Sequence, residues 1–303
     1  MASLNNSSLR NTPSSGASEP PRSSMIHDKV DLCLWTKNGE RTLNAVLTQI
    51  EKVIPRININ QKIIIDDSSS DSTRTIAKLH GWQVYMNTWG GISNGANAAL
   101  SHVETEYFCS FEQDVILASD WWRKISPLIH KPGVAAASGI RYPSGPPGIT
   151  AVFRYSANNY DKGAFTLGKT LDNTIYRTSV LRTIGGFPKL KINAGIDLAL
   201  SYKLEEEKWK WITDLSVESI HLRFGLMDEI RHQESYGSQT PEIYRLMGKR
   251  FSIRNQLLRV FRCPVGSFYI IAKTHEPSVL YVFPLIRIYF LKGIAQSHVV
   301  TRT

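Results

Sequence analysis

The segment that most constrains the fold of this chain is residues 61–73, QKIIIDDSSSDST. Three consecutive isoleucines, residues 63–65, lead directly into the carboxylates of Asp66 and Asp67. An apolar run without polar alternation is typical of a strand that is buried on both faces of a parallel sheet. Open α/β sheets bind their ligands outside the carboxyl ends of such strands. The sequence therefore predicts a ligand site at Asp66 and Asp67.

A purely local role for these acids is the alternative. Asp66 and Asp67 would then only shape a turn, and Asp71 or Ser72 would only cap the helix after them. Two adjacent carboxylates at a buried strand end need hydrogen-bond donors or a ligand to offset the cost of burial. We therefore favour a functional role for the pair, whereas capping and function remain equal alternatives for Asp71 and Ser72.

Strands and helices alternate on both sides of this segment. Further strands are predicted at residues 30–36, 82–86, 107–111, 134–138 and 173–176. Helices are predicted at residues 41–53, 72–80, 93–103, 119–130 and 194–207. This alternation indicates βαβ units on a mostly parallel sheet. Residues 141–148, RYPSGPPG, are rich in proline and glycine, and we expect an irregular loop between two subdomains there.

Composition narrows the class of partner. The chain of 303 residues has a net charge of +10, which favours an anionic partner such as phosphates, nucleic acid or an acidic membrane surface. Its three cysteines, at positions 33, 109 and 263, form neither a metal-binding nor a disulfide pattern. We expect reduced thiols in a cytosolic setting.

The two ends of the chain differ from its middle. Residues 1–24 are rich in Ser, Asn and Pro and lack the apolar core of a signal peptide, so a disordered tail is predicted. Residues 243–261 are basic and amphipathic, and residues 268–272 and 279–291 are apolar. Neither apolar run reaches the roughly 20 residues that span a bilayer. We expect these helices to lie in a membrane interface, with simple packing on the domain as the alternative.

A second acidic strand end comes directly after residues 107–111. Glu112 and Asp114 stand one residue apart there and can jointly hold Mg²⁺ or Mn²⁺, which favour carboxylate oxygens and often share substrate phosphates. A single such pair is usually a solvated turn. Two acidic strand ends in one alternating sheet favour a site for a metal ion and phosphates.

Several segments resemble, in order, the motifs of the family 2 glycosyltransferases, which are nucleotide-sugar-dependent enzymes with the GT-A fold. Residues 36–43, TKNGERTL, are similar to the family's opening strand and Asn-x-Glu loop. Residues 66–73, DDSSSDST, are similar to its DDGSxDxT motif, whose acids contact the base and ribose. Residues 95–100, GANAAL, resemble a further segment, with Ala96 where arginine is common.

The resemblance continues to about residue 225. Residues 111–114, FEQD, are similar to the strand that ends in the metal-binding DxD motif, with Glu112 in the first position. Residues 173–177 and 184–187 resemble the segment that leads to the acceptor site. The resemblance implies an α/β, Rossmann-like GT-A fold and a set of nucleotide-sugar-binding residues, namely Thr36, Asn38, Glu40, Asp66, Asp67, Asn97, Glu112 and Gln113.

The resemblance also implies a catalytic base and a metal site. Residues 195–200, GIDLAL, are similar to the family's GEDxDL, which makes Asp197 the base, although Ile196 stands where glutamate is common. The alternative for Asp197 is a helix N-cap. His221 resembles a late histidine that can complete the metal site of Glu112 and Asp114. A merely packed histidine is an equal alternative.

The function implied by the resemblance is sugar transfer. It would be inverting transfer from a UDP- or GDP-sugar, assisted by Mn²⁺ or Mg²⁺, to a lipid phosphate or a lipid-linked glycan. The processive signature Q-x-x-R-W is absent from the sequence, which favours transfer of one sugar at a time. With the basic carboxyl end, we expect the enzyme at an anionic membrane surface, peripheral to the cytoplasmic face.

Other classes fit less well. A nucleotide-sugar-binding module without catalysis would explain Ile196 and Glu112, but Asp67, Asp114 and Asp197 argue against it. No nucleic-acid-binding module is recognisable. A dinucleotide dehydrogenase would need a glycine-rich turn after the first strand, where this chain has TKNGE.

The expected organisation has three parts. After the tail at 1–24, a GT-A domain occupies residues 25–235, with a nucleotide-sugar half at about 25–140 and an acceptor half at about 141–235. Basic amphipathic and apolar helices at 236–303 complete the chain.

Overall fold

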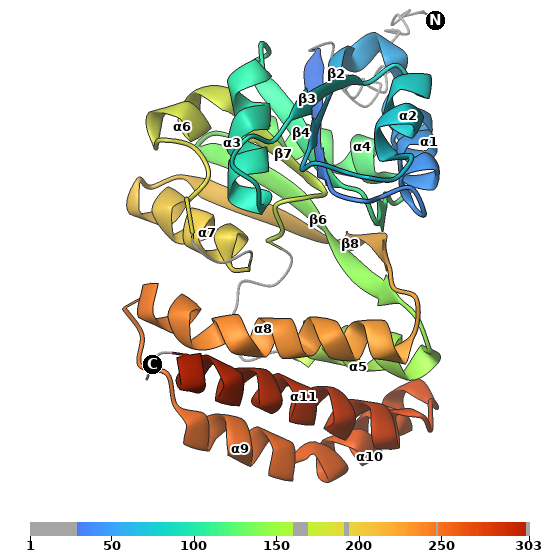
Figure 1. Ribbon diagram of the computed structural model, residues 1–303, viewed down its shortest axis with the longest axis vertical. Coiled ribbons are helices and arrows are strands. Elements are labelled where there is room, and N and C mark those ends of the chain that lie inside the picture. Colours follow the sequence, from blue (N-terminus) through green and yellow to red (C-terminus); the bar gives the residue numbers. More distant parts are fainter. Residues whose placement is uncertain (1–28, 160–168, 191–193, 247, 301–303) are drawn as a thin grey trace, which may run out of the picture.

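A computed structural model describes residues 29–159, 169–190, 194–246 and 248–300 (Figure 1). The tail predicted at residues 1–24 lies outside the described residues.

One curled sheet of eight strands organises the molecule, with helices on both of its faces (Figure 1). The strand order is β3-β2-β1-β4-β7-β6-β8-β5. The strands are β1 (Val30–Thr36), β2 (Ile59–Asp66), β3 (Gln83–Met86), β4 (Tyr107–Glu112), β5 (Val115–Ile116), β6 (Val134–Ser144), β7 (Thr174–Arg177) and β8 (Lys210–Leu222).

Helices connect and cover these strands. The α-helices are α1 (Leu43–Val53), α2 (Thr73–Leu79), α3 (Ile92–His102), α4 (Trp121–Ile125), α5 (Pro147–Asn159), α6 (Thr178–Thr183), α7 (Ile196–Glu206), α8 (Leu226–Leu246), α9 (Ile253–Phe261), α10 (Cys263–Thr274) and α11 (Val279–Val300). Two short 3₁₀ helices are η1 (Arg56–Asn58) and η2 (Ser126–His130).

The central strands are buried on both faces, as their apolar runs predict. Ile64 of β2 packs into one core with α1, α2 and α4. Its neighbours Ile63 and Ile65 pack into a second core with α3, α6 and α7 on the opposite face. Successive side chains of a strand point to opposite faces, so only an unbroken apolar run satisfies both cores. Asp66 is the last residue of this strand.

Two antiparallel strands, β7 and β5, stand in an otherwise parallel sheet. β3, β2, β1 and β4 are all parallel, as expected from their βαβ order. β7 then inserts antiparallel between β4 and β6, and β8 runs parallel to β6 and antiparallel to β5. The strand predicted at 134–138 therefore runs in the same direction as β4, as a mostly parallel sheet requires, but β7 lies between the two.

The prediction of an irregular loop at residues 141–148 is wrong. β6 continues to Ser144, and α5 begins at Pro147. Beyond Ser138, β6 pairs only with β8 among the described strands. Pro143 therefore lies where the other edge of β6 is unpaired, and a missing backbone N–H is tolerated at such an edge. Pro147 occupies the first helical position, for which proline is well suited. Long-range pairing overrides the local signal of RYPSGPPG.

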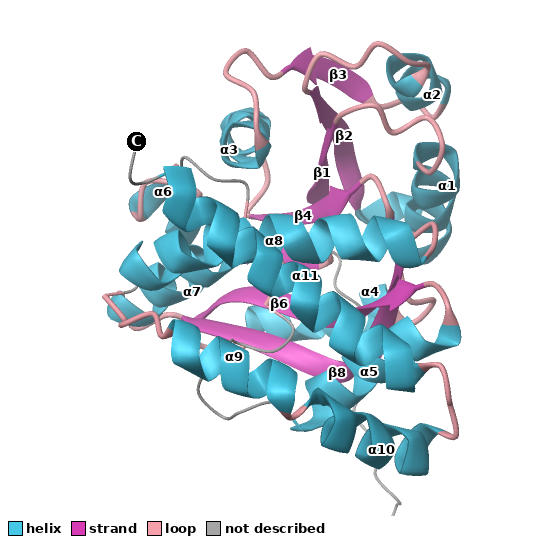
Figure 2. Cartoon of the chain, turned by 60° about the horizontal axis from the view of Figure 1, so that its bottom comes forward, coloured by secondary structure: helices cyan, strands magenta, loops and turns pink. Residues whose placement is uncertain are grey.

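The carboxyl-terminal helices form a layer together with α5 on one side of the sheet (Figures 1 and 2). The sequence does not predict α8, and residue 235, the expected limit of the acceptor half, lies inside it. α8 and α11 cross with their backbones in contact. A Cβ atom on Gly237 would lie 2.0 Å from the carbonyl oxygen of Phe290, and one on Gly293 would lie 1.9 Å from that of Glu234. Only glycine fits at either position.

α11 is longer than the predicted apolar run at 279–291. Pro284 and Arg287 do not interrupt it, and residues 279–297 are long and apolar enough to cross a membrane. The expectation that both apolar runs are too short to span is therefore wrong for this helix. Core helices of soluble proteins also pass this test of length and composition, so the finding by itself assigns no membrane span.

Candidate active site

Two predicted ligand residues hold the loops at the sheet edge together. The Asn38 side chain accepts a hydrogen bond from the backbone N–H of Ser70 at 2.9 Å, and the backbone N–H of Asn38 donates to the hydroxyl of Ser69. The Glu40 carboxylate accepts from the backbone N–H of Ser72 at 3.0 Å. Asn38 and Glu40 thus join the loop after β1 to the loop after β2.

The two adjacent acids at the end of β2 have different surroundings. Asp66 is fully buried, and its Oδ2 accepts from the N–H of Ser69. Its Oδ1 has no hydrogen-bond partner among the described residues. Asp67 faces a cleft, where its Oδ2 accepts from the N–H of Gly91 at 3.1 Å and lies 3.6 Å from the ammonium of Lys37.

Asp71 supports the start of α2, whereas Ser72 does not. The Asp71 carboxylate accepts from the backbone N–H groups of Thr73 at 3.0 Å and Glu40 at 3.1 Å. Ser72 occupies the N-cap position, but its side chain makes no capping hydrogen bond. Of the two capping alternatives, the structure supports the one for Asp71.

A cleft of about 270 Å³ opens at the carboxyl ends of β1, β2 and β4, and we call it the first cleft. Gln113 connects the residues after β4 to the end of β1 at this cleft, because its Oε1 accepts from the Thr36 hydroxyl at 2.5 Å and from the Lys37 N–H at 2.9 Å. The cleft is lined by Trp35, Thr36, Lys37, Ile65, Asp67, Asn87, Gly91, Ile92, Glu112, Gln113 and Asp114.

Not every predicted nucleotide-sugar residue lines this cleft. Thr36, Asp67, Glu112 and Gln113 do, whereas Asn38, Glu40, Asp66 and Asn97 are absent from its lining.

The carboxamide of Asn97 supports a turn instead. It accepts from the N–H of Phe187 and donates to the carbonyl of the same residue, both at 2.9 Å. Gly186 approaches it closely, because a Cβ there would lie 2.3 Å from the Asn97 Oδ1. Asn97 therefore positions the turn at residues 185–187.

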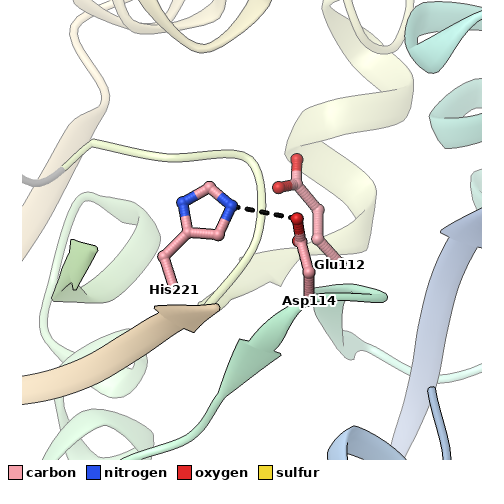
Figure 3. Close-up of side chains that lie close together, drawn as sticks. All are labelled: Glu112, Asp114 and His221. Carbon is pink, nitrogen blue, oxygen red and sulfur yellow. Dashed lines mark hydrogen bonds and ion pairs between the residues drawn. The ribbon is translucent and has the colours of Figure 1, made fainter. Parts of the chain in front are cut away.

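Glu112, Asp114 and His221 come together as a possible metal site (Figure 3). One potential ligand atom from each lies within 4.8 Å of the others. β5 pairs with β8 so that Val115 stands opposite His221, and this register brings the imidazole Nε2 to 3.1 Å from the Asp114 carboxylate. His221 is distant in sequence from the two acids, and the antiparallel pairing of two strands joins them.

The protonation states of this cluster suit a divalent cation. Burial opposes ionisation of Asp114, but the hydrogen bond from His221 and the nearby charges of Arg141 and Arg223 lower its pKa to about 2. Burial, together with the charge of Arg141, lowers the pKa of His221, which leaves its imidazole neutral near pH 7. Carboxylates and a neutral imidazole are a donor set that accommodates Mn²⁺ or Mg²⁺.

A second cleft, of about 210 Å³, lies beside the first. Glu112 lines both clefts, Asp114 the first and His221 the second, so the possible metal site lies at their junction. The second cleft is lined by Ile92, Glu112, Arg141, Leu171, Ala194, Gly195, Ile196, Asp197, His221, His232, Ser235, Tyr236 and Gln239.

Asp197 lies in the first turn of α7, at the second cleft. Its Oδ1 accepts from the N–H of Leu198 at 2.8 Å. Burial raises its pKa, and a carboxylate with a raised pKa is a better proton acceptor near neutral pH. Ile196, which departs from the family motif, is 2% exposed and packs into the core. Isoleucine in place of the family's glutamate therefore removes a carboxylate and still fills the core at this position.

Sequence reasoning missed two largely buried arginines behind the cluster, whose side chains are 16% exposed (Arg141) and 8% exposed (Arg223). The Arg141 guanidinium lies 2.9 Å from the Glu112 carboxylate and 3.3 Å from that of Asp172. Asp172 is fully buried, and burial raises its pKa, while the charge of Arg141 opposes that rise. Arg223 lies 3.5 Å from Asp114 and contacts His232 at 2.8 Å. These groups come from separate parts of the fold, at positions that no local motif connects.

Comparisons with known proteins give the family of the chain. The model of the family described as glycosyl transferase family 2 matches residues 32–184. The O-antigen chain rhamnosyltransferase WbaN of Salmonella anatum is 28% identical over 183 residues, which is 54% of this chain. The chain spans 57% of the length of that relative.

Solved structures share the fold at low identity. The mannosyltransferase PcManGT of Pyrobaculum calidifontis, in complex with GDP-Man and Mn²⁺, has a TM-score of 0.56 at 16% identity, over 90% of this chain and 75% of its own. Glucosyl-3-phosphoglycerate synthase of Mycobacterium tuberculosis, in complex with Mn²⁺, UDP and glucosyl-3-phosphoglycerate, has a TM-score of 0.53 at 14% identity, over 74% of this chain and 82% of its own. The predicted GT-A fold is confirmed.

Proposed function

The chain belongs to glycosyl transferase family 2, and we propose that it moves a single sugar from a nucleoside-diphosphate sugar to a lipid-linked or glycan hydroxyl, with inversion. One observation carries this proposal. The Glu112–Asp114–His221 cluster lies at the junction of two clefts, one at the sheet edge and one beside Asp197. The first cleft would take the nucleotide and the second the acceptor.

The donor would lie with its diphosphate at the junction. Glu112, Asp114 and His221 would hold Mn²⁺ or Mg²⁺ there, and the ion, when bound, supplies positive charge for the leaving diphosphate. Asp67 and Thr36 line the first cleft and would contact the nucleotide. Similar folds that bind GDP-Man or UDP with Mn²⁺ support this choice of donor.

The acceptor side would supply the base. Asp197 takes the proton of the attacking hydroxyl, which adds to the anomeric carbon from the face opposite the diphosphate. That displacement inverts the anomeric configuration. The raised pKa of Asp197, caused by burial, fits this role. A lipid phosphate acceptor would already be ionised and would depend less on Asp197.

A membrane acceptor is supported by charge and by the curated relative. Residues 243–303 contain ten lysines and arginines against one acidic residue, Glu276. They therefore carry nine of the ten units of net positive charge. The relative WbaN is an O-antigen chain enzyme. We propose that this chain works on a lipid-linked glycan or a lipid phosphate, peripheral to the cytoplasmic face of a membrane.

The test is a transfer and hydrolysis assay with UDP-, GDP- and dTDP-sugars, Mn²⁺ or Mg²⁺, and membrane lipid extract. Wild type should turn over one class of donor, and chelation, Asp114→Asn or Asp197→Asn should each abolish transfer to hydroxyl acceptors. Asp120→Asn, at an ion pair of α4, is the matched control and should retain activity. Absence of nucleotide binding would contradict the proposal, and metal-dependent binding without turnover would favour a non-catalytic binding module.

A further inference from the structure

The helix pair α9–α10 exposes large apolar side chains. Six of the exposed apolar side chains are Leu257, Leu258 and Phe261 of α9 and Val265, Phe268 and Tyr269 of α10. Within each helix they recur at spacings of one, three or four residues, which places them on one side of it. Phe261 is 78% exposed, Val265 75% and Phe268 64%. The buried face carries Cys263 and Ile270, both at 0% exposure, together with two polar groups, Gln256 at 6% and Ser267 at 0%. Covering a core therefore accounts for the buried side of the pair but not for these six exposed apolar side chains.

The outward apolar face is not needed for the local core. The carboxyl-terminal layer has its own apolar cluster between α5, α10 and α11, which includes Ile149, Ile270, Val282 and Ile286. Tyr269 contacts Tyr155 beside this cluster, whereas Phe261, Val265 and Phe268 are not among its members and are each at least 64% exposed. Side chains such as Phe261 therefore remain available for another surface.

Cations surround this face, and the sequence near it lacks acids. Arg250, Arg254, Arg262 and Lys273 are all exposed, and no aspartate or glutamate occurs between Glu242 and Glu276. Apolar side chains flanked by lysine and arginine are typical of helices that lie in the interface of an anionic bilayer. A second copy of the same face would bring like charges together, which disfavours self-association through it.

We propose that the outward face of α9–α10, defined by the six apolar residues above, docks into the interface of an anionic lipid bilayer. α11 does not serve as a membrane span in this arrangement. It lies against α8 with backbones in contact at Gly237 and Gly293, and Lys292 pairs with Glu234 at 3.0 Å. Spanning a bilayer would break those contacts, whereas docking through α9–α10 keeps them.

Docking would place one wall of the active site on the membrane-bound layer. α8 carries His232 and Tyr236 into the second cleft, while Gly237 on the same helix contacts α11. α11 in turn packs on α9 and α10. The inference rests on the proposed function for its acceptor, because the second cleft would then receive a glycan that is anchored in the same bilayer.

The test is flotation of the full chain with vesicles of phosphatidylcholine, alone or mixed with phosphatidylglycerol. We expect binding to the mixed vesicles and weak binding to phosphatidylcholine alone. Phe261→Ser with Phe268→Ser should lower the affinity about tenfold or more, since two large apolar groups leave the interface. Arg254→Glu with Arg262→Glu should do the same through lost attraction to anionic lipid.

A matched control removes two equally exposed apolar residues elsewhere. Ile57 and Leu79 are 76% and 82% exposed in the nucleotide-sugar half, and Ile57→Ser with Leu79→Ser should bind vesicles like wild type. Equal binding of all variants, or no preference for phosphatidylglycerol, would overturn the proposal. The proposal would also be overturned if wild type bound no vesicles and instead sedimented as a dimer that Phe261→Ser with Phe268→Ser dissociates.

Donor hydrolysis without vesicles separates this proposal from the proposed function. Both α9–α10 variants should hydrolyse the donor at the wild-type rate and lose transfer only to lipid-anchored acceptors. Vesicle binding without any donor hydrolysis would contradict the proposed function alone. Transfer to a lipid-anchored acceptor that is unaffected by the variants would contradict the docking surface alone.

Discussion

The two clefts are built in different ways. The first cleft forms at the carboxyl ends of β1, β2 and β4, and its residues come from short sequence motifs. Several hydrogen bonds of these motifs join the loop after β1 to the loop after β2. The second cleft draws Arg141, Asp197, His221 and His232 from β6, α7, β8 and α8. A local motif can therefore specify the first cleft, whereas only tertiary pairing assembles the second.

The largest expected effect comes from breaking the buried pair behind the second cleft. Arg141→Ala leaves the fully buried Asp172 without its cation, and we expect a loss of about 3–5 kcal/mol in the free energy of unfolding. Chemical denaturation would measure this loss. Arg123→Ala, which removes an exposed partner of Asp120, should cost less than about 1 kcal/mol.

A double-mutant cycle sharpens that test. Arg141→Ala with Asp172→Ala removes both charges, so part of the lost stability should return. If the double variant were as unstable as the sum of the two single variants, the pair would not be coupled.

Separating α8 from α11 should affect the second cleft more than the first. Gly237→Ala places a Cβ where the Phe290 carbonyl lies, and such overpacking costs about 1–3 kcal/mol. Thermal unfolding measures the effect on the α8–α11 contact, and nucleotide binding measures the effect on the first cleft. We expect a lower melting temperature and lower transfer, with nucleotide affinity retained. Gly145→Ala, where a Cβ meets only ordinary contacts, is the control.

The pH dependence of transfer should report Asp197. Burial raises the pKa of this carboxyl, and the base must be ionised to accept a proton. Activity should therefore fall as pH falls through this raised pKa, with a midpoint above the value of about 3.9 for an ordinary aspartate. A profile of kcat/KM against pH measures the midpoint. A midpoint at or below the ordinary value would contradict the assignment of Asp197 as base.

The smallest effects are expected in the β2–α2 loop. Asp71→Ala removes acceptors for the Thr73 and Glu40 N–H groups and should cost about 1 kcal/mol. Ser72→Ala removes no capping hydrogen bond and should change stability by less than about 0.5 kcal/mol. Denaturation of both variants measures the difference. A larger cost for Ser72→Ala would show that the serine is the cap.

The same contrast explains what sequence could predict. The run at 63–65 and the acids after it predict β2, its burial on two faces and the sheet edge, because period and composition are local signals. The loop expected at 141–148 is a strand and a helix start, since pairing of β6 with β8 decides the outcome. Arg141, Asp172 and Arg223 carry no local signal, because their partners are distant in sequence or on another element.

The most direct test of the two-cleft account separates binding from turnover. Calorimetric titration of a UDP- or GDP-sugar with Mn²⁺, and single-turnover transfer to a hydroxyl acceptor, would be measured on Asp114→Asn and Asp197→Asn. We predict that Asp114→Asn loses metal-dependent donor binding, while Asp197→Asn binds donor like wild type and transfers at least about 100-fold more slowly. Wild-type turnover in Asp197→Asn, or unchanged donor binding in Asp114→Asn, would contradict the account.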